Sequence, residues 1–226
     1  GVMPTGAWAT NRTVQRGSVY DGNGDPLTPT WPSDFGGPVI QPSQTSDAKL
    51  MAGFPLPSIP IQPLGYGDAR NIFQRALGGF AFPSNAPGWN TTGFFAALSA
   101  GGIGPSTSFA IRMEVARNLV VKNITNVVAT MFGSVEPDRV VMLGCHRDAW
   151  TYGAVDPISG HSIVLETGRA LGLLQTQYGW RPRRTIQLLS WDAEEWACTG
   201  STEYVETYIE LLRQRGVAYI NLDTAV

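Results

Sequence analysis

From residue 111 onward, the apolar positions change between strand-like runs and helical spacing. Four runs are apolar, rich in β-branched residues and of strand length: Asn126–Phe132, Arg139–Gly144, Arg184–Ser190 and Val217–Leu222. Between them, Ser159–Thr176 places its apolar residues at helical spacing, and Glu194–Arg215 is helical in stretches. Strands that alternate with helices predict an α/β domain with a mixed, largely parallel sheet flanked by helices. Residues 133–138 predict a hairpin or a tight connection between the first two strands.

The first 110 residues follow a different pattern. They hold 30 of the 42 glycines and prolines but only 10 of the 34 charged residues, so turn chemistry dominates there. One short helix is expected at Tyr66–Leu77, ended by Gly78 and Gly79, among short strands and long loops. The shift in composition predicts two differently built domains, residues 1–120 and residues 121–226.

Composition excludes several classes of protein. The formal charge of −2 argues against a nucleic-acid binder that relies on a broad basic surface. The two cysteines are too few for a disulfide-stapled mini-domain. No run approaches the roughly 18 apolar residues that a membrane span needs. The 226 residues allow one large domain or two small ones.

Three of the four predicted strands run directly into side chains that can bind metals. These are His146 after the second strand, Asp192, Glu194 and Glu195 after the third, and Asp223 after the fourth, while Asp156 precedes the long predicted helix. In open α/β sheets, ligands bind at the carboxyl ends of the strands. Residues far apart in sequence are therefore expected to converge on one rim of the sheet.

One imidazole with four of these carboxylates suits a pair of divalent ions such as Zn²⁺ or Mn²⁺. Two such ions about 3.5–4 Å apart activate a water and stabilise a tetrahedral intermediate. Within Glu194-Glu195, one carboxylate can ligate while the other takes a proton from water. Each acid alone is equally typical of a solvated turn or a helix cap, as for Asp192. The signal is the joint pattern, since the chain has no Gly-x-Ser-x-Gly elbow and no phosphate-binding glycine loop.

Long motifs occur in order along the chain: GDPLTP at 24–29, GCHRDAW at 144–150, DPISG at 156–160, SWDAEE at 190–195 and YINLD at 219–223. These motifs resemble those of the glutamate carboxypeptidase II (prostate-specific membrane antigen) group of di-zinc metallopeptidases, in the transferrin receptor-like superfamily. The resemblance covers most of the chain. It implies a partial zinc exopeptidase fold for residues 121–226 and a β-rich apical, protease-associated domain for residues 1–120.

The resemblance also implies roles for single residues. His146 would bind one zinc, Asp156 would bridge two zincs, Glu195 would bind the second, and Asp223 would complete the first. Glu194 would be the general base that later protonates the leaving amine. Glu203 and Glu206 match positions that help to hold a structural calcium in the group, and the alternative for both is a helix surface facing solvent.

The chain is expected to be an internal fragment of a longer protein. In the group, the second zinc also takes a histidine far downstream of the last aspartate, and a helical dimerisation region follows. Both would lie beyond Val226, so the fragment is expected to be inactive and the full-length protein a homodimer. The group's carboxypeptidases clamp a terminal glutamate with an arginine that residues 30–55 lack, so a different terminal-residue preference is expected.

Location and partners follow from the resemblance and from three N-x-S/T sequons, at Asn11, Asn90 and Asn123. They favour a glycoprotein outside the cell or in the secretory-pathway lumen. It would be the ectodomain of a single-pass membrane protein whose anchor lies outside this chain, and a peptide would be its substrate. Whether Cys145 and Cys198 form a disulfide stays open.

Two alternatives to a carboxypeptidase share the same scaffold. One is a non-catalytic ectodomain like that of the transferrin receptor, which lacks a working metal site. A non-catalytic ectodomain is disfavoured because all five residues of ligand type are present: His146, Asp156, Glu194, Glu195 and Asp223. The other is an aminopeptidase with the same metal site, which would prefer a substrate with a free amino terminus.

Overall fold

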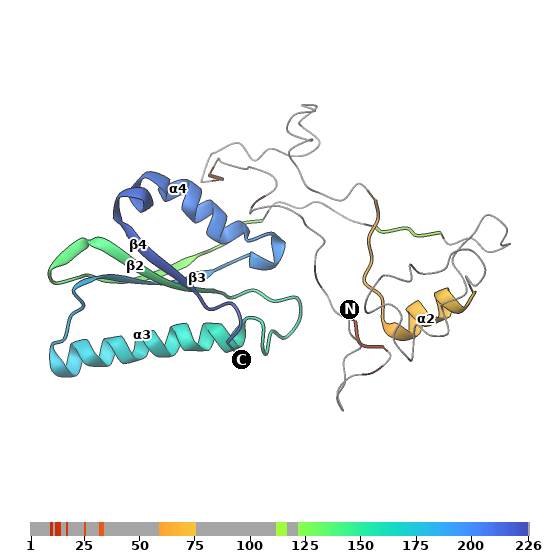
Figure 1. The fold of residues 1–226 in the computed structure, drawn as a ribbon, viewed down its shortest axis with the longest axis horizontal. Coiled ribbons are helices and arrows are strands. Elements are labelled where there is room, and N and C mark those ends of the chain that lie inside the picture. The colour runs from red at the N-terminus through yellow and green to blue at the C-terminus, as the bar shows by residue number, and fades with distance from the viewer. Residues whose placement is uncertain are drawn as a thin grey trace, which may run out of the picture. The chain divides into compact units, whose positions relative to one another are not determined.

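A computed structural model describes residues 10, 12–14, 17, 25, 32–33, 59–75, 112–116 and 122–225. The chain divides into two compact units: Gly1–Gly17 with Ser58–Asn118, and Ser18–Pro57 with Leu119–Val226. In the first unit, helix α2 spans Tyr66–Arg75, inside the predicted helical range (Figure 1). The other strands and turns predicted for the first 110 residues fall almost wholly outside the described residues. The predicted domain identities therefore stay predictions.

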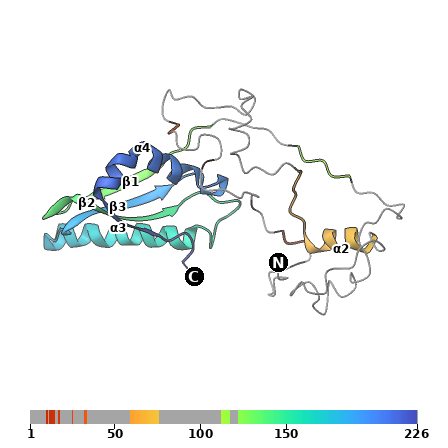
Figure 2. The same cartoon turned by 45° about the horizontal axis from the view of Figure 1, so that its top comes forward.

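The second unit is built on a four-stranded sheet with the order β1-β3-β2-β4. Its strands are β1, Val127–Met131; β2, Glu136–His146; β3, Arg184–Trp191; and β4, Gly216–Asn221. Strand β2 runs parallel to both β3 and β4, while β1 pairs with β3 in the antiparallel sense. The predicted mixed, largely parallel sheet is confirmed (Figure 2).

The connection between β1 and β2 is tight, but the two strands do not form a hairpin. Strand β3 lies between them, so that part of the prediction is wrong. The reason is visible in the hydrogen bonds of the connection. The amide of Gly133 donates to Thr185 Oγ1 at 3.1 Å, and the amide of Ser134 donates to the Pro182 carbonyl at 2.8 Å. The connection therefore binds the chain that enters β3 instead of closing a turn on itself.

Two helices cover the sheet from opposite sides (Figures 1 and 2). Helix α3 spans Ile158–Tyr178 and α4 spans Thr199–Arg215, close to the helical ranges predicted from the spacing of apolar residues. The predicted stretch Glu194–Arg215 is broken, because a short 3₁₀ turn, η2 (Glu194–Trp196), precedes α4 and two left-handed residues separate them. In the described parts of the chain, no helix is long and apolar enough to span a membrane.

The core of the second unit lies around the carboxyl ends of β2 and β3. Cys145 and Leu189 are fully buried there, and Val164 of α3 packs from one side. Trp191, the last residue of β3, joins three elements. Its Nε1 donates to the Tyr219 hydroxyl of β4 at 2.8 Å, and its ring centroid lies 5.1 Å from that of Tyr204 on α4. The end of β3 is thus held to its neighbours by one aromatic cluster.

Helix α3 begins in close contact with the chain that leaves β4. A Cβ atom on Gly160 would overlap the Leu222 carbonyl oxygen and would lie 2.7 Å from that of Asp223. The amide of Ala225 donates to the Ser159 hydroxyl at 3.0 Å in the same region. Glycine at position 160 therefore allows this close approach.

We expect Gly160→Ala to lower the free energy of unfolding by about 1–3 kcal/mol, because backbone must move to accommodate the methyl group. Gly172→Ala is the matched control in the same helix, since nothing lies within 4 Å of its added Cβ. That change is expected to be neutral or to stabilise by up to about 1 kcal/mol through helix propensity. Urea unfolding of both variants measures the difference, and equal effects would contradict the packing argument.

Candidate metal centre

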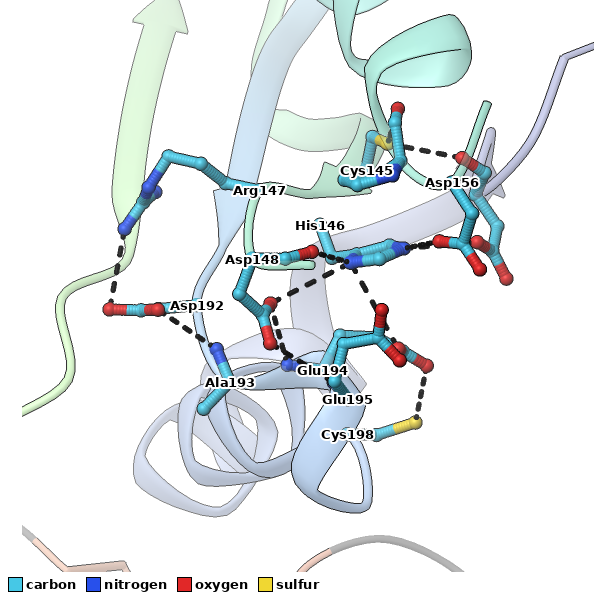
Figure 3. A network of polar contacts seen from close by, with 12 residues as sticks. Cys145, His146, Arg147, Asp148, Asp156, Asp192, Ala193, Glu194, Glu195 and Cys198 are labelled. Carbon is cyan, nitrogen blue, oxygen red and sulfur yellow. Dashed lines mark hydrogen bonds and ion pairs between the residues drawn. The ribbon is translucent and has the colours of Figure 1, made fainter. Parts of the chain in front are cut away.

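Three potential metal ligands meet at the carboxyl ends of the parallel strands. His146 ends β2, Asp156 lies in the loop before α3, and Asp223 follows β4. One ligand atom from each lies within 4.8 Å of the others. The Nε2 atom of His146 is 2.8 Å from Asp156 Oδ1 and 3.1 Å from Asp223 Oδ1 (Figure 3). The structure therefore brings these three predicted residues to one rim, as the ends of their strands indicated.

The other ring nitrogen of His146 is held by the backbone. Nδ1 lies 2.9 Å from the Asp148 carbonyl oxygen, which only accepts, so Nδ1 carries the proton in that bond. In the neutral ring, the Nε2 lone pair then faces the two carboxylates. This is the usual arrangement of a histidine that ligates a metal, whose second nitrogen is fixed by an outer partner.

Negative charge dominates the surroundings of the buried imidazole. Burial opposes protonation of His146, but hydrogen bonding to Asp148 and Asp223 and the charges of Glu194 and Asp156 outweigh it. Together they raise the pKa of His146 to about 9. A position that stabilises an imidazolium so strongly also favours a bound cation.

The turn η2 presents Glu194 and Glu195 beside His146. Glu194 Oε2 lies 3.9 Å from His146 Nδ1, and the Trp150 amide donates to Glu195 Oε1 at 3.3 Å. Burial raises the pKa of both carboxyl groups. For Glu195 the charge of Asp156 is the next cause.

Asp148 organises this turn, a role that the sequence did not reveal. Its Oδ1 accepts from the amide of Glu194 at 2.9 Å and its Oδ2 from the amide of Glu195 at 3.1 Å. These bonds lower the pKa of Asp148, although burial opposes the shift and hydrogen bonding to His146 contributes more. Asp148 stands in the same motif as His146, but its partners follow 46 and 47 residues later. No local pattern signals such a bond.

Asp192 has a structural role, which was the alternative to metal binding that the sequence left open for it. Its Oδ1 accepts from the Ala193 amide at 3.0 Å, and its Oδ2 accepts from the Thr125 amide at 2.9 Å. Arg147 Nη2 lies 3.4 Å from the same Oδ2. Asp192 therefore fastens the end of β3 to the segment before β1 and is occupied by those partners.

The turn around Glu194 and Glu195 has an uncommon backbone. Ala193, Ala197 and Cys198 adopt φ values of 54°, 70° and 53°, and they are the non-glycine residues with positive φ in the described parts of the chain. Side chains other than glycine and asparagine rarely adopt this conformation, which costs roughly 1–2 kcal/mol per residue. Such strain often accumulates at functional sites.

Glu203 and Glu206, the predicted calcium ligands, lie on α4 and are half-buried. Glu203 Oε2 accepts from the Ser33 amide at 2.5 Å, so α4 contacts the segment that follows the GDPLTP motif. Half-burial fits a fully solvent-facing helix surface poorly. The calcium assignment itself stays a prediction.

Both cysteines are free thiols. Cys145 is buried and its Sγ lies 3.7 Å from the Pro157 carbonyl oxygen and 3.6 Å from that of Asp223. Cys198 is exposed, and its Sγ lies 3.5 Å from Glu194 Oε1. In this structure, therefore, Cys145 and Cys198 do not form a disulfide.

We expect Asp148→Asn to lower the free energy of unfolding by about 1–3 kcal/mol, because the new amide group points a donor at a backbone N–H. The matched control is Asp138→Asn, since Asp138 is exposed and lies 3.9 Å from Arg139. A surface change of that kind is expected to stay within about 0.5 kcal/mol. Urea unfolding compares the two variants, and an equally small effect at position 148 would show that the turn does not depend on Asp148.

Comparison with known proteins identifies a family and several relatives with similar sequences. Residues 126–226 match the sequence model of Peptidase family M28. The chain is 39% identical to "Glutamate carboxypeptidase 2 homolog" of Caenorhabditis briggsae over 98% of its length, and 40% identical to "Aminopeptidase NAALADL1" of Rattus norvegicus over 94%. It spans 28% of the length of each of these relatives.

One solved structure, a peptidase M28 precursor from Shewanella amazonensis, aligns at 30% identity with a TM-score of 0.38, over 41% of this chain and 21% of that chain. The assignment depends on sequence, and the matched residues include all four strands and the His146 cluster. Residues 126–226 therefore match peptidase family M28, and the chain as a whole is similar to proteins named as glutamate carboxypeptidases and aminopeptidases.

Proposed function

We propose that the chain is the metal-binding part of a zinc-dependent exopeptidase that hydrolyses peptide bonds. The observation that carries the proposal is the cluster of His146, Asp156 and Asp223, with the Glu194 carboxylate 3.9 Å from the same imidazole. The donor set fits zinc, since it combines an imidazole nitrogen with carboxylate oxygens. It also offers His146 an outer partner on its second nitrogen.

The residues divide between two zinc sites. His146 and Asp223 would hold the first ion, Asp156 would bridge, and Glu195 would hold the second together with a histidine from a downstream part of the full-length protein. Bound zinc supplies Lewis acidity, which polarises a peptide carbonyl and lowers the pKa of water. The contact of Asp156 Oδ1 with His146 Nε2 at 2.8 Å, together with the effect of its charge on Glu195, supports the bridging position.

Glu194 is the proposed general base. Its Oε2 lies 3.9 Å from His146 Nδ1, and it would take a proton from the attacking water and later give it to the nitrogen of the leaving amine. Burial raises the pKa of Glu194, which strengthens the carboxylate as a base near neutral pH. The two bonds from Asp148 fix the backbone that carries it.

The terminal preference of the enzyme has two candidates. The relatives include proteins named as glutamate carboxypeptidases and proteins named as aminopeptidases, at nearly equal identity. Residues 30–55 contain no arginine to clamp a terminal glutamate carboxylate. We therefore place a carboxypeptidase with altered terminal specificity first and an aminopeptidase second.

The wider setting of the protein is also a proposal. The sequons and the resemblance support a glycosylated ectodomain in the secretory pathway or outside the cell, anchored through a segment outside this chain. They also support a homodimeric full-length protein, with a protease-associated domain in residues 1–120 and a structural calcium near Glu203 and Glu206. This chain alone would then lack a zinc ligand and would not hydrolyse peptides.

In the full-length protein, Glu194→Gln is expected to lower kcat by about 10²–10⁴-fold while zinc content is unchanged, because a neutral amide cannot take the proton. His146→Ala is expected to lose zinc as well as activity. Glu210→Gln is the matched control, since Glu210 is exposed on α4 and pairs with Arg213. Peptide hydrolysis and elemental analysis measure the effects, and unchanged hydrolysis in Glu194→Gln would overturn the mechanism.

A panel of short peptides, free or blocked at each end, separates the two candidate specificities. A carboxypeptidase is expected to lose at least about tenfold in kcat/KM when the carboxyl terminus is amidated, because the terminal charge then loses its partner. An aminopeptidase would lose activity on acetylation of the amino terminus instead. Mass spectrometry of the products identifies the released residue. Insensitivity to both blocks would rule out an exopeptidase.

A further inference from the structure

We infer that Cys198 is a positioning residue for Glu194, whose thiol donates a hydrogen bond to one oxygen of the carboxylate and so orients the other toward the reaction. The inference rests on the proposed function, which makes Glu194 the general base. It adds a residue outside the set of metal ligands and proton carriers already described.

The geometry divides the two oxygens of Glu194 between two neighbours. Cys198 Sγ lies 3.5 Å from Oε1, while Oε2 lies 3.9 Å from His146 Nδ1 (Figure 3). A carboxylate that accepts on Oε1 cannot rotate freely about its last bond. The contact with Cys198 therefore keeps Oε2 beside the His146 imidazole.

The backbone places the thiol for this contact. The amide of Cys198 donates to the Glu194 carbonyl at 2.8 Å, so the two residues are joined through the main chain as well. Both Ala197 and Cys198 adopt left-handed conformations between η2 and α4. A residue in the ordinary helical region would carry its side chain in another direction. The strained turn thus has a specific effect, which is to direct Sγ at the carboxylate.

The thiol is in the state that donation requires. Although Cys198 is exposed as a residue, desolvation of its thiol and then the negative charge of Glu194 raise the pKa of Cys198 to about 11, so the sulfur carries its proton at neutral pH. Glu194 as a carboxylate can only accept, which settles the direction of the bond. Cys145 differs, because the partners of its Sγ among the described residues are the carbonyl oxygens of Pro157 and Asp223.

Infrared spectroscopy of the S–H stretching region tests the bond without any assay of activity. The band of Cys198 is isolated by subtracting the spectrum of Cys198→Ser, and a donated bond lowers its frequency. We expect Glu194→Ala to shift this band to higher frequency, while Cys145→Ala removes a separate band and leaves it in place. A Cys198 band at the same frequency in Glu194→Ala would overturn the inference.

Kinetics of the full-length protein test the positioning role. A hydrogen bond of ordinary strength predicts a fall in kcat of about twofold to tenfold in Cys198→Ala, with KM and zinc content unchanged. Cys198→Ser retains a donor and is expected to recover most of the rate. A serine variant as slow as the alanine variant would overturn the role of the donor and leave only packing.

The outcomes separate this inference from the proposed function. If Glu194→Gln abolishes hydrolysis but Cys198→Ala leaves kcat unchanged, the inference fails and the proposed function stands. If Glu194→Gln leaves hydrolysis intact, the proposed function fails, and the positioning role fails with it. The infrared shift would then report a structural hydrogen bond alone.

Discussion

The parallel pairing of β2 and β3 sets His146 opposite Trp191 at the carboxyl edge of the sheet. The residues after Trp191 turn back toward the imidazole. Glu194 therefore lies beside His146, and Glu195 follows it in the same short turn, η2. The pairing of β2 with β4 ends two residues earlier along β2, at Gly144 and Asn221, and Asp223 follows two residues later at the same edge. A one-residue slip of either strand would turn its side chains to the other face and separate the ligands.

Concentrated negative charge is the second feature of this edge. Four carboxylates lie within 4 Å of the imidazole nitrogens, those of Asp148, Asp156, Glu194 and Asp223, and Glu195 also feels the charge of His146. Mutual repulsion contributes to the raised pKa values of Glu194 and Glu195, after burial. Divalent cations relieve such repulsion.

Most strands and helices of the second unit could be predicted from the sequence, because the spacing of its apolar residues indicates them. The convergence of His146, Asp156 and Asp223 followed from a topological rule about strand ends. The hairpin was wrong because pairing partners depend on the whole sheet, and β3 competes successfully for β1. Alanine and cysteine give no signal for positive φ, so the break before α4 was not predictable. The bonds that Asp148 accepts come from a turn 46 and 47 residues away, so the sequence near Asp148 does not indicate them.

The left-handed residues around Glu194 and Glu195 also limit how this segment can change in evolution. Threonine, valine and isoleucine are nearly excluded from positions 193, 197 and 198, since branching at Cβ makes positive φ still more costly. Glycine would relieve the strain at any of the three, yet at 198 it would also delete the thiol. Substitutions at these three positions are therefore expected to favour small residues. A substitution at position 198 would also change the hydrogen bond to the Glu194 carboxylate.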